Sequence, residues 1–145
     1  PQEKMFEVLD YSVDFFPNDR PRYLMGVGKP SDIIGSVLRG VDMFDCVIPT
    51  RSGRNGQAFV QDGTINLKNA KNQLDEKPID ENCSCYCCAN YSRGYLSHLV
   101  RSNEILGSIL LTWHNLYFYV NLMKKIRELI QKREFTAFAK QFLQN

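Results

Sequence analysis

Residues 22–48 read RYLMGVGKPSDIIGSVLRGVDMFDCVI, and this stretch decides the class of fold. Two short apolar runs, 22–28 and 43–48, are bounded by turn residues and are typical of buried strands. The residues between them carry an apolar stripe at helical spacing, with Ser31 as the predicted N-cap and Gly40 as the end. A strand, a crossover helix and a second apolar strand together predict an α/β fold with parallel strands.

An amphipathic helix predicted over 3–16 comes before the first strand and gives the order αβαβ. Two strands are too few for a closed barrel or an open doubly wound sheet, because a (β/α)8 barrel takes about 250 residues. This chain has 145 residues, and its first is Pro1 rather than Met. We therefore expect it to be a piece of a longer protein or a processed product.

After Pro49 the alternation of apolar strands and helices ends, and the sequence predicts elements of other kinds. These are a polar, glycine-rich loop over 50–56, a β-hairpin over 57–67 around an Asp62-Gly63 turn, a helical turn over 69–73, a cysteine-rich loop, and helices over 91–100, 103–131 and 134–143. The helix over 103–131 is expected to be interrupted near Thr112.

Composition excludes several classes of protein. Hydrophobic residues make up 43% of the chain, as in ordinary globular domains. No stretch approaches the roughly 18 uninterrupted apolar residues of a membrane helix, so no membrane partner is expected. The net charge is only +2, which argues against a purely electrostatic nucleic-acid binder. No secretory signal is evident, so we expect a cytoplasmic protein.

Four of the five cysteines fall within 83–88, which indicates a metal site rather than a disulfide framework. Cys83, Cys85 and Cys88 would supply three thiolates, and His114 follows in a helical segment. Three sulfurs and one imidazole complete a tetrahedral Zn²⁺ and leave no open position for a substrate. The spacing therefore predicts one structural zinc ion per chain.

Spacing alone leaves alternatives open. Cys87 could replace Cys88, although adjacent ligands on a short loop strain the geometry. His98 could replace His114 as the fourth ligand. Four buried cysteines without a metal remain the alternative to any zinc site.

Asp45 lies inside an otherwise apolar predicted strand, where an unpaired charge is expensive. It is therefore either a structural ion pair or a catalytic group, because the carboxyl ends of parallel strands face the active site in β/α folds. Arg51 and Arg54 follow on the predicted loop, where they are either solvated or placed to contact phosphates. Lys29 ends the other predicted strand and would face the same side.

Three motifs together resemble the tRNA-guanine transglycosylase family, in its bacterial form. They are YLMGVG at 23–28, DMFDCVIPTRSGRNG at 42–56, and the cysteine cluster followed by His114-Asn115-Leu116. The resemblance covers nearly the whole chain in order. It implies the C-terminal part of a (β/α)8 TIM barrel with an inserted zinc-binding subdomain and C-terminal helices.

The resemblance also implies residue roles. Asp45 matches the nucleophile that attacks C1′ of the ribose, so that guanine leaves and a covalent RNA ester forms. The family's residues that line the base pocket correspond here to Tyr23, Met25 and Gly26. Those that contact the tRNA correspond to Lys29, Arg51 and Arg54. The zinc ligands match Cys83, Cys85, Cys88 and His114, which favours His114 over His98.

By this resemblance the parent enzyme exchanges the wobble guanine of tRNAs with GUN anticodons for 7-aminomethyl-7-deazaguanine, and it forms homodimers through the zinc subdomain. The expected division is 1–56 for the last β/α units, 57–115 for the hairpin and zinc-binding subdomain, and 116–145 for the C-terminal helices. The family's guanine-recognising carboxylate and general acid/base would lie before Pro1, so this chain alone is expected to be inactive. Two other hypotheses are a zinc-stabilised RNA-binding or dimerisation module and a non-catalytic partner subunit.

Overall fold

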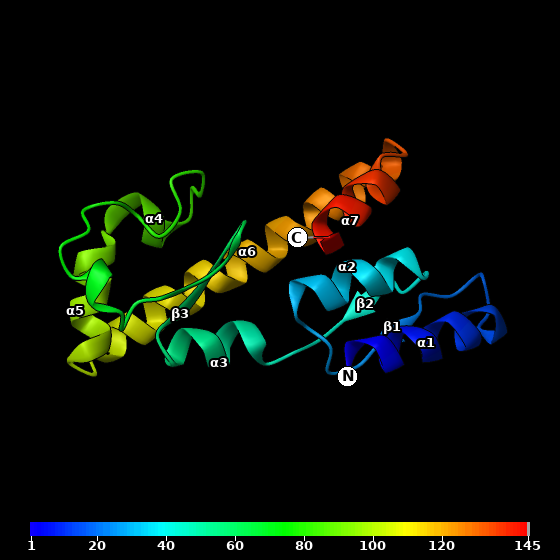
Figure 1. Cartoon of the computed structure of the whole chain (residues 1–145), viewed down its shortest axis with the longest axis horizontal. Helices are drawn as coiled ribbons and strands as arrows, with labels where there is room; N and C mark the ends of the chain where they lie inside the picture. The colour runs from blue at the N-terminus through cyan, green and yellow to red at the C-terminus, as the bar shows by residue number, and fades with distance from the viewer. Residues whose placement is uncertain (145) are drawn as a thin grey trace. The chain divides into compact units, whose positions relative to one another are not determined.

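The computed structural model describes residues 1–144 and divides them into two compact units, which are described one at a time. Unit 1 consists of Pro1–Val47 together with the chain from Met123 onward, and unit 2 is Ile48–Leu122. Both mix helices with short strands, and Figure 1 labels the α-helices and β1 to β3. The described residues contain no helix with the length and apolar character needed to cross a membrane.

Unit 1 begins with α1 (Gln2–Ser12), a 3-10 turn (Val13–Phe15), β1 (Tyr23–Leu24), α2 (Pro30–Leu38) and β2 (Met43–Phe44). The predicted order αβαβ is confirmed, and β1 and β2 pair in parallel with Tyr23 opposite Met43. The strands are shorter than the apolar runs predicted. Helix α2 starts with Pro30 at its first turn after Lys29, so Ser31 is not the N-cap.

Gly40 ends α2 as predicted. It has a φ of +89°, and its N–H bonds to the carbonyl of Val37 while the N–H of Val41 bonds to that of Ser36. This pair of bonds is a Schellman motif, which requires the left-handed conformation that glycine adopts without strain. The motif turns the chain directly into β2.

The prediction that both strands are buried is wrong for the face that carries Tyr23 and Met43. These opposed side chains are 51% and 50% exposed, whereas Leu24 and Phe44 on the other face are half-buried. Parallel strands are buried only where other elements cover them. Within residues 1–144 the β1–β2 sheet has two strands, and no element covers this face.

The end of the chain adds the last part of α6 (Ile105–Gln131) and then α7 (Phe135–Gln144) to unit 1, and α7 packs against α2. Ile126, Phe135 and Ala139 are the buried residues of this region. The ammonium of Lys125 lies 4.8 Å from the centre of the Phe138 ring, an attractive cation–π arrangement.

Unit 2 starts with a helix where a loop was predicted. Helix α3 (Ile48–Arg54) carries Pro49 in its first turn, where the missing N–H does no harm. Gly53 lies directly against α6, because a Cβ there would come within 2.7 Å of the backbone nitrogen of Thr112. Contact with α6 thus stabilises a helix that is too short to form on its own.

The hairpin is confirmed, with β3 (Gln57–Val60) paired to β4 (Gly63–Asn66). The elements that follow are the 3-10 turn η2 (Ala70–Asn72), α4 (Tyr86–Asn90), α5 (Arg93–Arg101) and α6 (Ile105–Gln131). Helix α6 is continuous, so the interruption expected near Thr112 is wrong. The core of unit 2 takes side chains from β3, α4, α5 and α6 and from the segments between the elements: Ala58, Leu67, Ile79, Cys85, Cys87, Cys88, Leu96, Leu99, Leu110 and Leu111.

Candidate metal centre and catalytic carboxylate

The structure brings the four predicted metal ligands together in unit 2. The Nδ1 atom of His114 lies 3.7 Å from the sulfur of Cys83, 3.5 Å from that of Cys85 and 3.3 Å from that of Cys88. All four ligand atoms lie within 4.8 Å of one another. Only Cys83 is partly exposed, and the other three residues are buried.

This donor set fits a tetrahedral metal ion. Bond lengths of about 2.3 Å to sulfur and 2.0–2.1 Å to nitrogen place tetrahedral ligands roughly 3.5–3.8 Å apart. The sulfur–nitrogen distances lie at or close to that range. Three thiolates and one imidazole are the ligands of structural zinc sites, so these residues would hold Zn²⁺.

Local structure aims each ligand at this point. Cys85 is the N-cap of α4, and its sulfur accepts a hydrogen bond from the N–H of Cys88 one turn later. This places Cys88 on a helix rather than on the loop predicted from sequence. His114 comes from the middle of α6, so a metal bound here would fasten the cysteine segment to that helix.

The ring of His114 is oriented by a second contact. Its Nε2 lies 2.7 Å from the carbonyl oxygen of Phe59 in β3. A carbonyl can only accept, so Nε2 carries the proton and Nδ1 offers its lone pair to the sulfurs. Such a partner for the other ring nitrogen fixes the tautomer of metal-binding histidines.

The thiols influence one another's acidity. The hydrogen bond from the Cys88 thiol lowers the pKa of Cys85 to about 3, and the same bond raises the pKa of Cys88. Burial raises the pKa of Cys83. Burial also raises the pKa of Cys87 to about 12, so this fully buried thiol stays protonated and packs in the core.

The structure separates the four ligands from the two alternatives. Cys87 is not part of the cluster, and His98 is an exposed residue of α5 that is not part of it either.

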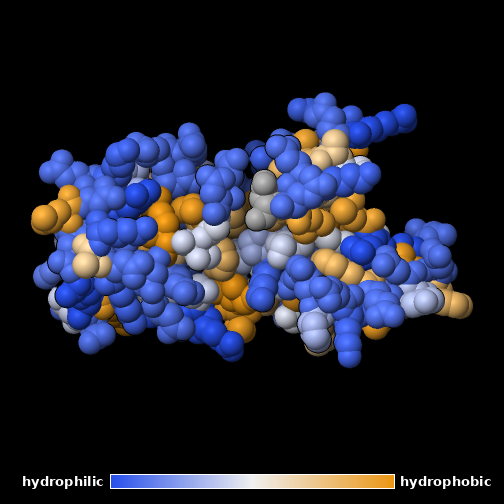
Figure 2. Space-filling view, viewed as in Figure 1, coloured by the Kyte–Doolittle hydropathy of each residue, from blue (hydrophilic) through white to orange (hydrophobic). Residues whose placement is uncertain are grey.

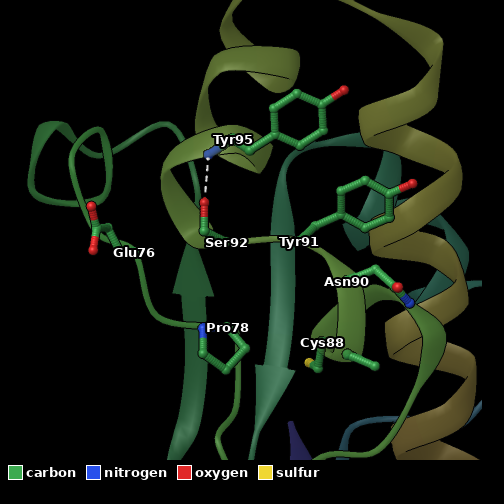
Figure 3. A pocket seen from close by; sticks show the side chains of 8 residues that line it. Glu76, Pro78, Cys88, Asn90, Tyr91, Ser92 and Tyr95 are labelled. Carbon is green, nitrogen blue, oxygen red and sulfur yellow. Dashed lines mark hydrogen bonds between the residues drawn. The ribbon is translucent and has the colours of Figure 1, made fainter.

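A hollow of about 430 Å³ adjoins the cluster at Cys88, between the loop carrying Glu76 and the α4–α5 turn (Figure 3). Two of its residues, Tyr91 and Tyr95, stack with their ring centres 5.5 Å apart.

In unit 1 the structure places Asp45 at the carboxyl ends of β1 and β2. The Oδ1 atom of Asp45 accepts a hydrogen bond of 2.6 Å from the hydroxyl of Tyr23 and one of 2.9 Å from the N–H of Gly26. The hydrogen bond from Tyr23 is the main cause that holds the pKa of Asp45 below its ordinary value. The same bond raises the pKa of Tyr23.

These contacts bear on one of the two interpretations of Asp45, the structural ion pair. The carboxylate is exposed, and within residues 1–144 it makes no salt bridge. A structural ion pair is therefore not what holds it. Gly26 has a φ of +74°, which turns its N–H toward the carboxylate, and the space around its Cα is open.

The remaining predicted site residues are divided between the units. Met25 is 73% exposed beside Gly26, and Lys29 directly precedes α2, both in unit 1. Arg51 and Arg54 are exposed residues of α3 in unit 2. Spaced three apart on a helix, the two arginines lie on neighbouring positions of one face.

The role of Asn115 was not predicted from the sequence. Its side chain is fully buried and bonds to three backbone groups near α3 and β3. The signal was available, because a polar residue follows a metal ligand inside an apolar helical stretch. Nothing in the sequence, however, named the backbone groups that it bonds.

Known proteins that this chain resembles in sequence belong to one family. The chain matches the queuine tRNA-ribosyltransferase family over residues 1–145. It is 64% identical over 130 residues to a queuine tRNA-ribosyltransferase of Rickettsia massiliae and to one of Rickettsia rickettsii, in each case over 90% of this chain and 36% of the relative. It is 57% identical over 141 residues to the enzyme of that name from a Ruegeria species, over 97% of this chain and 38% of the relative. The chain thus spans a little over a third of the length of these relatives.

Proposed function

The chain belongs to the queuine tRNA-ribosyltransferase family, and on this premise we propose that it is the C-terminal part of an enzyme that exchanges a guanine in tRNA. The replaced base is the wobble guanine of GUN anticodons, in the tRNAs for Asp, Asn, His and Tyr. The incoming base is 7-aminomethyl-7-deazaguanine, in queuosine biosynthesis. We place this activity in the cytoplasm.

The observation that carries this proposal is the setting of Asp45. Its carboxylate is ionised, exposed and oriented by two donors that both bond to Oδ1. One oxygen of Asp45 attacks C1′ of the ribose, the C1′–N9 bond breaks, and guanine leaves with a proton from an acid elsewhere in the enzyme. The nitrogen of the incoming base then attacks C1′, loses its proton and releases the carboxylate.

The residues around Asp45 supply binding in this scheme. Exposed Tyr23 and Met25, with the open backbone of Gly26, would line one side of the base pocket. Lys29, Arg51 and Arg54 would contact phosphates of the anticodon loop, since all three are exposed cations. The metal, when bound, holds the fold of unit 2 and takes no part in the chemistry.

The proposal extends to the whole protein. Residues 1–56 would contribute the last β/α units of a (β/α)8 barrel, 57–115 the zinc-binding subdomain and 116–145 the C-terminal helices. The uncovered face of the β1–β2 sheet supports this assignment, because a barrel would bury it. The isolated chain would be inactive, because positioning and proton transfer each contribute orders of magnitude to the rate.

Exchange of labelled guanine into tRNA by the full-length protein tests this function. Asp45→Asn should lower the exchange rate by on the order of 10³-fold or more, because the amide cannot attack C1′. Asp14→Asn alters another exposed acid of unit 1 and should leave the rate unchanged. Full exchange by Asp45→Asn would refute the assignment of the nucleophile, and a wild-type protein without exchange would favour a non-catalytic RNA-binding role.

A further inference from the structure

The buried side-chain amide of Asn115 makes three hydrogen bonds to backbone groups. Its Oδ1 accepts a 2.9 Å hydrogen bond from the N–H of Phe59. Its Nδ2 donates two bonds of 2.9 Å, one to the carbonyl of Pro49 and one to that of Gln57. Both N–H groups of the amide are therefore used, and the residue has no exposed surface.

The three bonded groups lie before and after Arg51 and Arg54 in the chain. Pro49 is in the first turn of α3, while Gln57 and Phe59 belong to β3, which follows α3. One side chain of α6 thus fixes the chain before and after the residues that carry Arg51 and Arg54. Neither arginine makes a salt bridge within residues 1–144, so both cations remain available to an anionic ligand.

The backbone of α3 is in close contact with α6, so the position of α3 is sensitive to the hydrogen bonds from Asn115. Gly53 leaves no room for a Cβ against Thr112, so α3 lies on α6 with its backbone rather than with an interlocking side chain at that point. A helix of seven residues has little stability of its own. The bonds from Asn115 are therefore a main constraint on where the two guanidinium groups lie.

Phe59 of β3, which bonds to Asn115, also bonds to a ligand of the metal site. Phe59 donates its N–H to Asn115 and accepts at its carbonyl from the ring of His114, the neighbouring residue of α6. Consecutive residues of one helix thus bind both polar groups of one strand residue. The metal ligand His114 and the residue Asn115, which holds α3, are thus both hydrogen-bonded to Phe59.

We propose that Asn115 is a positioning residue for tRNA binding, which holds Arg51 and Arg54 of α3 in place on the metal-binding unit. This rests on the proposed function, in which the two arginines contact the tRNA. Asn115 touches neither the tRNA nor the reacting atoms. Its loss should therefore weaken tRNA binding far more than it slows the chemical step at Asp45.

Asn115→Asp in the full-length protein is the decisive variant, because it keeps the acceptor for Phe59 and removes both donors. The new carboxylate faces the carbonyls of Pro49 and Gln57 and repels them. The matched control is Asn72→Asp, since Asn72 is also a buried asparagine of unit 2, and its Nδ2 donates to the carbonyl of Asn66 at 2.7 Å.

We expect Asn115→Asp to raise KM for tRNA by roughly tenfold or more and to change kcat by less than about threefold, as expected when uniform binding is lost. Its metal content should stay at one per chain. Hydrogen exchange of the amides of 48–57 should be about tenfold faster than in the control variant, because α3 opens more often. If Asn115→Asp does not accumulate as folded protein, Asn115→Ser takes its place in the same measurements.

Two results would overturn the inference: KM and α3 exchange equal to those of Asn72→Asp, or loss of metal together with activity, which makes Asn115 a general folding residue. Failure of the proposed function looks different. In that case the wild-type protein exchanges no guanine, while hydrogen exchange at α3 and metal content still report whether Asn115 positions the helix.

Discussion

Asp45 is kept ionised by groups that the fold places beside it. The hydroxyl of Tyr23 and the N–H of Gly26 both stabilise the charged carboxylate, so its pKa lies below the ordinary value. A carboxyl with a lowered folded-state pKa stabilises the fold above its unfolded pKa, and this contribution disappears as pH falls through the folded pKa. A nucleophilic role needs the same charged form, so the same two hydrogen bonds would support both the fold and the reaction.

Tyr23→Phe should therefore move the pH profile of the full-length enzyme. Without the hydroxyl, the pKa of Asp45 rises toward its ordinary value, and the acidic limb of kcat/KM shifts to higher pH. At neutral pH the carboxylate stays charged, so any loss of rate there reflects lost base contacts. The measurement is a pH–rate profile of guanine exchange.

The control for this profile is Tyr11→Phe, which alters an exposed tyrosine of α1. Its acidic limb should coincide with that of the wild type. A Tyr23→Phe limb at the wild-type position would show that the hydroxyl does not control the charge of Asp45.

The sequence predicted those side chains whose chemistry depends on their spacing along the chain. Cys83, Cys85 and Cys88 lie close together in the chain, so any compact fold keeps them near one another. The sequence could not predict Asn115, because its partners lie more than fifty residues away and are backbone groups without a sequence signature.

Among the elements, α6 connects several parts of unit 2. It supplies His114 to the metal cluster, packs against α3 at Gly53 and carries Asn115. A metal bound at the four ligands would join α6 to the segment from Cys83 to α4. Folding of unit 2 should consequently depend on the metal.

His114→Ala tests this dependence, with His98→Ala as the matched control. We expect one zinc per chain in the wild type and in the control, and none in His114→Ala. The thermal midpoint of His114→Ala should fall to that of the chelator-treated wild type, because structural zinc supplies folding free energy. Metal analysis and thermal unfolding measure both quantities.

Two outcomes would contradict the metal assignment. If His98→Ala lost the zinc and His114→Ala kept it, the fourth ligand would be wrong. If the wild type contained no zinc and chelators left its thermal midpoint unchanged, the cluster would be a set of packed thiols.

The elements also show where local patterns mislead. The residues of α3 include a proline, a glycine and two arginines, a composition typical of a loop. They form a helix because the backbone of α6 and the amide of Asn115 hold them. Tertiary contacts of this kind override local propensity and leave no periodicity to detect.

Over the whole molecule, the exposed apolar surface is the main feature that one copy leaves unexplained. Figure 2 shows hydrophobic side chains among the polar surface. In unit 2, one face of α6 carries a stripe of exposed apolar residues: Ile105, Ile109, Trp113, Leu116 and Val120. Exposed Tyr86 of α4 lies beside Trp113, with ring centres 6.2 Å apart. Stripes of this kind mark protein interfaces.

We propose that this stripe forms part of a homodimer interface, and Trp113→Glu in the full-length protein tests it. A buried charge at the centre of an apolar interface should shift the protein from dimer to monomer at micromolar concentration. Thr64→Glu places the same charge on the exposed hairpin and should leave the dimer intact. Sedimentation analysis gives the mass of each variant, and a Trp113→Glu dimer as tight as the control would exclude the stripe from the interface.

Whole-molecule architecture was the least predictable level. Residues 22–48 predicted the parallel pairing of β1 and β2 correctly, because a short crossover helix allows little else. They could not predict the burial of that sheet, since burial depends on which other elements cover its faces. The (β/α)8 barrel accordingly remains a prediction.

The division of the chain into units has a consequence for its synthesis. Unit 2 is one uninterrupted stretch, Ile48–Leu122, whereas unit 1 needs residues from before and after it. Every ligand of the metal cluster, and Asn115, has therefore been translated before α7 exists. At ~5–20 residues per second, the ribosome gives unit 2 a lead on the order of seconds over the contact between α2 and α7. A metal ion that binds at these four ligands can therefore do so before unit 1 is able to close.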